Sequence, residues 1–125
     1  MKKKKVTITT GSVEEFFNHV RANAAKLDSG EGVAPGTTIM FEDPLEMLNV
    51  LTYERIRLLR MAKKGALPIA TLATELDRDL RAVSRDVVRL EKAGLLRTRY
   101  RANPGHGRSK IVEPVAKEYL LSAMI

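Results

Sequence analysis

Apolar and polar side chains follow two different periods within the first 41 residues. Val6 and Ile8 are separated by threonine, and this period of two is typical of a short strand. Residues 13–27 carry apolar side chains at helical spacing, and Ser12 with Glu15 forms the capping box expected where a helix begins. Residues 38–41 predict a second short strand that can pair with the first. The first part of the chain therefore predicts a strand-helix-strand unit.

A helical period follows from residue 44 to residue 93, with interruptions at Gly and Pro. Residues 44–51 predict a short helix or turn, and Thr52 is suited to cap a helix that runs to residue 64 and ends at Gly65. Pro68 is suited to the first turn of the next helix. A connection at residues 77–79 leads to a further helix over residues 80–93, which Gly94 ends.

The last part of the chain has strand character around a turn-rich segment. Residues 95–101 and 110–113 flank the segment 102–109, which predicts a hairpin with a long tip. Residues 115–124 predict a terminal helix. Aromatic side chains at helical or strand spacing are usually buried, so we expect four of them in the core: Phe16, Phe17, Tyr53 and Phe41.

Composition excludes several classes of protein. A length of 125 residues suits about one domain. The absence of Cys excludes a disulfide framework and thiolate metal sites, and His19 and His106 lie too far apart in the sequence to favour a zinc site. No nucleophile, general base and orienting acid stand at a recognisable spacing. We therefore expect no metal, no cofactor and no enzymatic activity.

Five acidic residues could be mistaken for catalytic carboxylates or for ligands of a hard cation. They lack the alternating acidic loop of a calcium site, and no Gly-rich phosphate motif accompanies them. Capping and solubility explain them better. These residues are Glu14, Glu15, Glu42, Asp43 and Glu46.

Charge is distributed unevenly along the chain. The net charge is +7, whereas residues 78–110 alone carry ten basic and three acidic groups. On a helical wheel, Val83, Val87 and Leu90 form one apolar stripe, while the basic side chains of residues 78–92 fall on the opposite side. A helix that is apolar on one side and basic on the other fits the major groove of DNA, which is wide enough for an α-helix.

The order helix, helix, short turn, basic helix and hairpin over residues 52–114 resembles a winged helix-turn-helix. Residues 72–76, with the sequence LATEL, match the second helix of that family, and the small side chain of Ala73 allows close helix packing. Residues 83–85 and 90–96 resemble the recognition helix and its exit in MarR-type and ArsR-type regulators. The turn position that usually holds Gly is Asp77 here, and Asp enters the left-handed region more readily than most residues.

The resemblance implies which residues contact DNA. Residues at the start and on the exposed face of the third helix read bases, and Arg is the commonest partner of guanine. Basic residues of the hairpin contact phosphates or the minor groove. The expected site residues are Arg78, Arg81, Ala82, Ser84, Arg85, Arg89, Arg97, Arg99, Arg101, Arg108 and Lys110.

The sequence as a whole predicts an α+β, mainly helical protein in which a winged helix-turn-helix follows a short strand-helix-strand unit. We expect an N-terminal extension at 1–48 for dimerisation or partner binding, a DNA-binding domain at 49–114, and a C-terminal helix or tail at 115–125. The expected function is that of a sequence-specific transcriptional regulator, a repressor that binds double-stranded DNA as a homodimer.

Two alternatives stay open beside this interpretation. Small regulators of this kind sometimes accompany toxins as antitoxins that repress their own operon, so the N-terminal unit could bind a toxin. A winged helix can also serve RNA or protein contact. No apolar run exceeds three residues, which predicts no membrane span. The absence of Cys suits a reducing cytosol, so with the expected DNA binding we predict a cytoplasmic, nucleoid-associated protein. The lysines at residues 2–5 are either a solvated tail or a DNA-contacting arm, and His106 is expected to be exposed.

Overall fold

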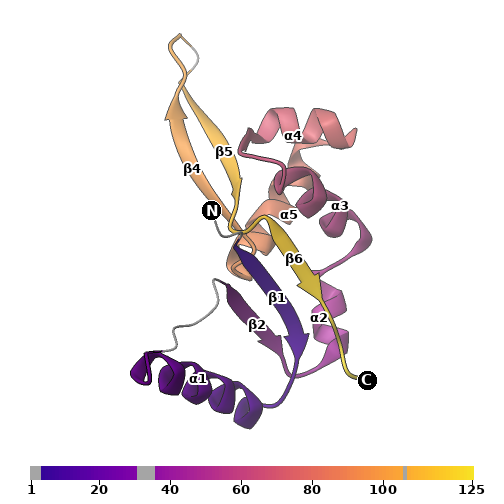
Figure 1. Ribbon diagram of the computed structural model, residues 1–125. Coiled ribbons are helices and arrows are strands. Elements are labelled where there is room, and N and C mark those ends of the chain that lie inside the picture. Colours follow the sequence, from indigo (N-terminus) through magenta and orange to yellow (C-terminus); the bar gives the residue numbers. More distant parts are fainter. Residues whose placement is uncertain (1–3, 31–35, 106) are drawn as a thin grey trace.

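The computed structural model describes residues 4–30, 36–105 and 107–125. Five helices and six strands form within these residues. In chain order they are β1 (Lys5–Thr10), α1 (Val13–Asp28), β2 (Thr37–Phe41), α2 (Pro44–Val50), α3 (Tyr53–Ala62), β3 (Leu67–Pro68), α4 (Ile69–Leu76), α5 (Leu80–Lys92), β4 (Leu96–Ala102), β5 (Arg108–Pro114) and β6 (Glu118–Leu121). The predicted mixed, mainly helical class is confirmed (Figure 1).

A parallel sheet joins the two ends of the described chain. Its strand order is β2-β1-β6, with Ile8 of β1 opposite Ile39 on one side and Leu121 on the other. The pairing of the first two strands is confirmed, whereas the prediction of a helix over residues 115–124 is wrong. The strand forms there because β1 offers an unpaired edge, and tertiary pairing of this kind outweighs a weak local helical preference.

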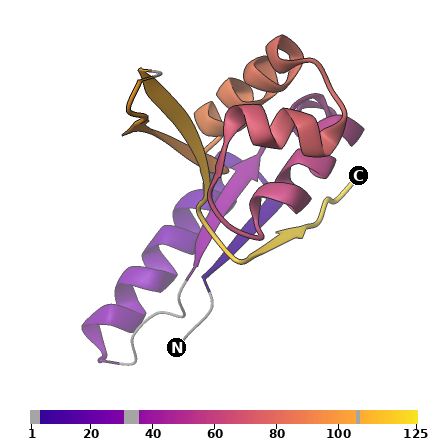
Figure 2. The same ribbon diagram turned by 90° about the horizontal axis from the view of Figure 1, so that it is seen from above.

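The winged part follows the order expected from the sequence. Helices α3, α4 and α5 are packed together, and β4 and β5 form an antiparallel hairpin whose base is completed by the short β3 (Figure 2). Thr52 caps α3 by accepting a hydrogen bond from the Arg55 amide at 3.4 Å, as predicted. Pro68, expected in the first turn of α4, instead directly precedes that helix and pairs with Ile111 in the small sheet.

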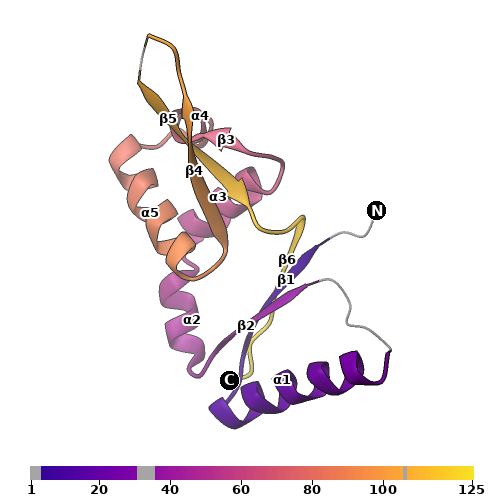
Figure 3. The ribbon, with the colours of Figure 1, turned by 90° about the vertical axis from the view of Figure 1, so that its left-hand side faces the viewer.

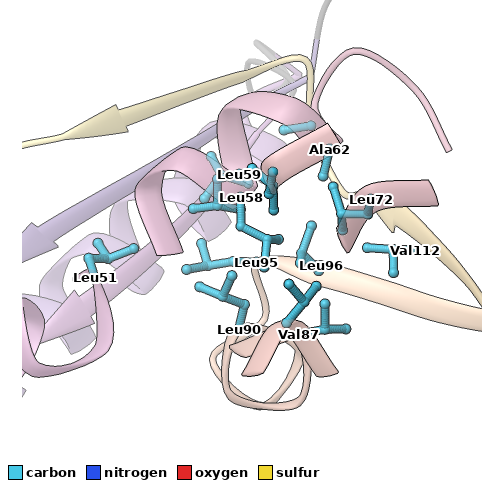
Figure 4. Close-up of a cluster of buried hydrophobic side chains, with 14 of the residues drawn as sticks. Leu51, Leu58, Leu59, Ala62, Leu72, Val87, Leu90, Leu95, Leu96 and Val112 are labelled. Carbon is cyan, nitrogen blue, oxygen red and sulfur yellow. The ribbon is translucent and has the colours of Figure 1, made fainter. Parts of the chain in front are cut away.

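One hydrophobic core holds the winged part and reaches the parallel sheet. Figure 4 shows its centre, where side chains from α3, α4, α5 and the two long strands of the hairpin meet. The fully buried members include Leu58, Leu72, Leu90 and Leu95, each at 0% exposure. Val6 and Ile8 extend this core into β1. Burying a side chain of this size contributes about 1.5–3 kcal/mol, so this core fixes the positions of α5 and the hairpin.

Helix α1 lies outside this core. The parallel sheet stands between α1 and the helices of the winged part (Figure 3). The helix begins with the predicted capping box, in which the Glu15 amide donates to Ser12 Oγ at 3.0 Å. The prediction that Phe16, Phe17 and Tyr53 are core residues is wrong, since they are 39%, 51% and 77% exposed. Of the four aromatic residues expected in the core, only Phe41 is packed against it.

Candidate nucleic-acid interface

Helix α5 has one buried apolar side and one exposed basic side. Val83, Val87 and Leu90 are each 0% exposed and face α3 and α4. Four basic side chains of the helix are exposed to solvent, whereas Ala82 and Ser84 on its flank are half-buried. The exposed basic residues are Arg81, Arg85, Arg89 and Lys92.

The turn between α4 and α5 sets the direction in which α5 leaves the core. Asp77 has a φ of 52°, so the Asp at this position adopts the left-handed backbone predicted for it. The amide of Arg78 donates to the carbonyl of Ala73 at 3.0 Å, which closes the end of α4. Asp79 then caps α5 by accepting from the Arg81 amide at 3.1 Å.

A buried acid on α5 holds the helix to the rest of the winged part. Asp86, which is 9% exposed, accepts from Arg55 Nε at 2.9 Å and from Arg78 Nη1 at 2.7 Å. Arg78 also lies 3.3 Å from Glu54, and Arg55 donates to two carbonyls at the end of α2. These pairs connect α3, the α4–α5 turn and α5 without contributing to the exposed basic side.

Arg78 therefore differs from the other basic residues expected in the site. Its side chain is 19% exposed, and its guanidinium is held by Asp86 and Glu54. Glu54 belongs to α3 and Asp86 to α5, so Arg78 connects these two helices and helps to orient α5. The sequence contains one signal for this pairing: on the helical wheel Asp86 lies beside the apolar stripe of α5 and not among its basic residues.

The hairpin presents two faces with different partners. Residues two apart on one strand share a face, as do residues directly opposite each other on paired strands. Tyr100 is opposite Lys110, and Thr98 shares their face. Both the amide and the hydroxyl of Thr98 donate to Glu91 of α5, at 2.9 and 2.7 Å, so this face lies on the α5 side.

The basic residues of the hairpin are divided between these faces. Arg108 belongs to the α5 side, where its guanidinium lies 5.0 Å from the centre of the Tyr100 ring. Lys110 is on the same side and is half-buried. The opposite face carries Arg97, Arg99 and Arg101, of which Arg99 is paired with Glu113.

Three exposed residues near the site were not foreseen from the sequence. Leu80 and Val88 are 47% and 41% exposed on α5, and Tyr100 is 58% exposed on β4. Val88 could have been predicted to be exposed, because on the helical wheel it falls beside the basic residues of α5. Apolar groups in such a position can contact the methyl group of thymine.

Several other residues and features considered in the sequence lie away from α5 and the hairpin or outside the described residues. His106 and the lysines at residues 2 and 3 lie outside the described residues. Lys4 and Lys5 line a shallow recess together with Arg97. Within residues 4–30, 36–105 and 107–125, no group of three His, Cys, Asp or Glu side chains could hold a metal ion. No helix of this described part is long and apolar enough to cross a membrane.

The fold and the position of α5 define a winged helix-turn-helix protein. Comparison with known families then identifies the family to which the chain belongs. The model of the HVO_A0114 family matches residues 50–114, which include all three helices of the winged part and its hairpin. The chain belongs to the HVO_A0114 family. No curated protein sequence matches it.

One solved structure supports the fold at low sequence identity, and two others show a weaker likeness. A possible transcriptional regulator from Methanosarcina mazei Go1 has 18% identity and a TM-score of 0.51 over 62% of this chain and 68% of its own. Reduced HlyU from Vibrio cholerae has 18% identity and a TM-score of 0.47, with 80% of each chain covered. The homodimeric winged helix-turn-helix DNA-binding domain of Mb0332 from Mycobacterium bovis has 16% identity and a TM-score of 0.44, over 59% of this chain and 71% of its own. At 18% identity the likeness to the Methanosarcina protein concerns the fold alone.

Proposed function

We propose that this protein is a sequence-specific, DNA-binding transcriptional regulator in which α5 enters the major groove and the β4–β5 hairpin is the wing. The observation that carries the proposal is the exposed basic side of α5, which is held outward by a fully buried apolar side. The module is residues 49–114. Binding that occupies a promoter excludes other proteins from it, so the proposed direction of regulation is repression.

The residues of α5 have separate roles in this proposal. Arg81, Arg85 and Arg89 lie on the exposed side and can reach guanine through two hydrogen bonds each. Ala82 and Ser84 are half-buried on the flank, so they limit how closely the helix approaches the bases. Arg78 acts indirectly, because it holds Asp86 and through it the helix.

The two faces of the hairpin suggest which of its basic residues contribute most to DNA binding. Arg108 and Lys110 lie on the α5 side, so they can contact phosphates of the same duplex. Arg97, Arg99 and Arg101 lie on the opposite face and contact DNA only if the duplex bends around the wing. We therefore expect Arg108→Ala to weaken binding more than Arg101→Ala.

The experiment that tests the function begins with selection of bound fragments from genomic DNA by the full chain. The selected site is then titrated at several salt concentrations beside a random duplex of equal length. If about five phosphates are neutralised, log affinity falls with log salt at a slope of roughly −4 to −5. A flat salt titration, or equal affinity for every duplex, would contradict a sequence-specific DNA role.

We also propose that the protein is a homodimer whose contact is made by α1. The exposed stripe of this helix carries Val13, Phe16, Phe17 and Val20 at 39–53% exposure. Glu14 and Arg21 are seven positions apart on one edge of this stripe. If two copies pair antiparallel about a two-fold axis near Phe17, each Glu14 lies opposite the partner's Arg21.

Sedimentation equilibrium tests the dimer at tens of micromolar. Phe17→Glu should give a monomer, whereas Leu48→Glu, at a position 58% exposed on α2, should leave the association unchanged. Glu14→Lys should weaken the dimer, and Arg21→Glu added to it should restore the pairing with the charges exchanged. A full chain that is monomeric and binds one non-palindromic site would contradict the dimer.

A further inference from the structure

A cavity lies between the parallel sheet and α3. Its volume is about 220 Å³, and its apolar wall includes Ile8, Leu51 and Leu59. These three side chains are 1–6% exposed, so the floor of the cavity belongs to the hydrophobic core. Leu121 of β6 forms part of its edge and is 43% exposed.

Two cations stand at the opening of this cavity. Arg60 and Lys63 lie on the last turn of α3 and just after it, and both are exposed. Within the described part of the chain, neither side chain has a hydrogen bond or an ion pair. The two arginines of α3 that do not line the cavity, Arg55 and Arg57, are both paired with acids. Two unpaired positive charges, those of Arg60 and Lys63, therefore lie at the cavity.

From this juxtaposition we propose that the cavity binds a small organic anion with an apolar body, such as an aromatic or short-chain carboxylate. The apolar end would contact Ile8 and Leu59, and the carboxylate would lie between Arg60 and Lys63. A dry apolar cavity of about 150 Å³ accommodates benzene, so about 220 Å³ suits a ring or short chain with one charged group.

The wall of the cavity is also in contact with the exit of α5. Tyr119 lines the cavity, and its hydroxyl donates to the carbonyl of Leu95 at 2.7 Å while accepting from the Val115 amide at 3.1 Å. Burial raises the pKa of this phenol further above its ordinary value, so the hydroxyl also stays protonated in moderately alkaline solution. On the other side of the cavity, α3 carries Arg55, which is bonded to Asp86 of α5.

A ligand that separates β6 from α3 would change both of these connections to α5. The ligand would thereby alter DNA affinity, and this second step rests on the proposed function. Linkage requires that DNA change the affinity for the ligand by the same factor, which for couplings of this kind is about 5- to 150-fold. Ligand binding itself needs no DNA and can be measured separately.

Titration of the full chain with phenylacetate, followed by amide chemical shifts, tests the site. For a ligand of about ten non-hydrogen atoms we expect a dissociation constant on the order of 0.1–1 mM. The shifts should include residues 8, 59 and 119. Uncharged phenylacetamide should bind about tenfold more weakly, because its carbonyl oxygen carries no negative charge and forms no ion pair with Arg60 and Lys63.

Variants connect the effect to the cavity. The double variant Arg60→Gln, Lys63→Gln should bind phenylacetate about tenfold more weakly and lose the preference for the acid over the amide. Lys64→Gln, an exposed lysine that does not line the cavity, is the matched control and should bind as the parent does. Leu121→Trp should fill the opening and abolish binding.

The outcomes separate the site from the proposed function. Absence of binding at 10 mM, on the order of ten times the weakest expected dissociation constant, would overturn the site. Equal binding of acid and amide, or no effect of the double variant, would do the same. Phenylacetate binding without any DNA affinity would leave the site intact and refute the DNA role. Binding that leaves DNA affinity unchanged would overturn the coupling through Tyr119 and α3.

Discussion

Helices α1 and α5 are both amphipathic, but only α5 has its apolar side covered within one molecule. The three apolar side chains at the centre of α5 are 0% exposed, whereas four of α1 are 39–53% exposed. On α1 the least exposed described side chains are polar: His19 and Asn23, which are 3.3 Å apart. The apolar side of α5 is therefore covered within the monomer, whereas the apolar side of α1 is left exposed to solvent.

This difference separates two uses of the same sequence pattern. In α5 the buried apolar side fixes the position of the helix, so its exposed side is presented to a ligand in a fixed geometry. In α1 the apolar side is itself the exposed surface. A period of 3.6 residues indicates that a helix has an apolar side, and tertiary structure decides what covers it.

The largest expected difference between the helices concerns stability. Leu90→Ala on α5 should lower the free energy of unfolding by about 3–5 kcal/mol, because the cavity left in a packed core collapses only partly. Phe17→Ala on α1 removes a larger side chain, yet in the monomer it should cost less than about 1 kcal/mol, because Phe17 is 51% exposed. Urea denaturation at a concentration below dimerisation measures both. Equal losses would show that α1 is packed in the monomer.

A second difference concerns the buried ion pairs, which α5 has and α1 lacks among its described residues. Asp86→Ala should cost about 3 kcal/mol, since it leaves the partly buried Arg55 without a carboxylate and Arg78 with Glu54 alone. Glu75→Ala, at an exposed acid on α4, is the control and should change stability by less than about 0.5 kcal/mol. A loss of the same size in both variants would mean that net charge, and not the pairing, is responsible.

The third difference concerns DNA. Arg85→Ala should weaken binding to the selected site by about 1–3 kcal/mol and change binding to random DNA little, because Arg85 is expected to read a base. Arg108→Ala, in the wing, should weaken both. Arg21→Ala on α1 removes the same charge from an exposed helix. At protein concentrations where the dimer persists, it should change binding neither to the selected site nor to random DNA. Equal losses for Arg85→Ala on both duplexes would exclude α5 as the reader.

The smallest expected difference concerns the helix caps. Asp79 caps α5 and Ser12 caps α1, and removal of such a cap costs about 1 kcal/mol. Asp79→Ala should lower global stability by this amount, because α5 cannot unfold without the core. Ser12→Ala should instead increase amide hydrogen exchange within α1 and leave the midpoint of urea unfolding unchanged. A shift of that midpoint by Ser12→Ala would contradict the independence of α1.

Sequence reasoning was most successful where the signals are local. The boundaries of α3, α4 and α5 are within about two residues of those expected, because each helix has a cap or a stop residue beside it. The left-handed conformation of Asp77 was predictable for the same reason. Exposure of Arg81, Arg85 and Arg89 followed from the helical wheel, because the opposite side of α5 is strongly apolar.

The features that were missed depend on partners distant in the sequence. Asp86 and Arg55 are 31 positions apart, so their pairing cannot be read from either segment alone. The division of the wing arginines between two faces depends on the register of β4 with β5. Residues 118–121 carry no period of two, and they form a strand only because β1 presents an edge. The exposure of Phe16 and Phe17 reflects where α1 docks, which its own period does not determine.

The parallel pairing of β6 with β1 has a consequence for the order of folding. It joins residues 113 positions apart, as the bond from Ser122 Oγ to Thr9 Oγ1 illustrates. Contacts so distant in the sequence form late, because the intervening chain must first be brought together. The winged part, whose contacts are closer in the sequence, can fold while β1 still has an open edge. Refolding should therefore show protection of α3–α5 amides before those of β1, and the third strand should close the molecule last.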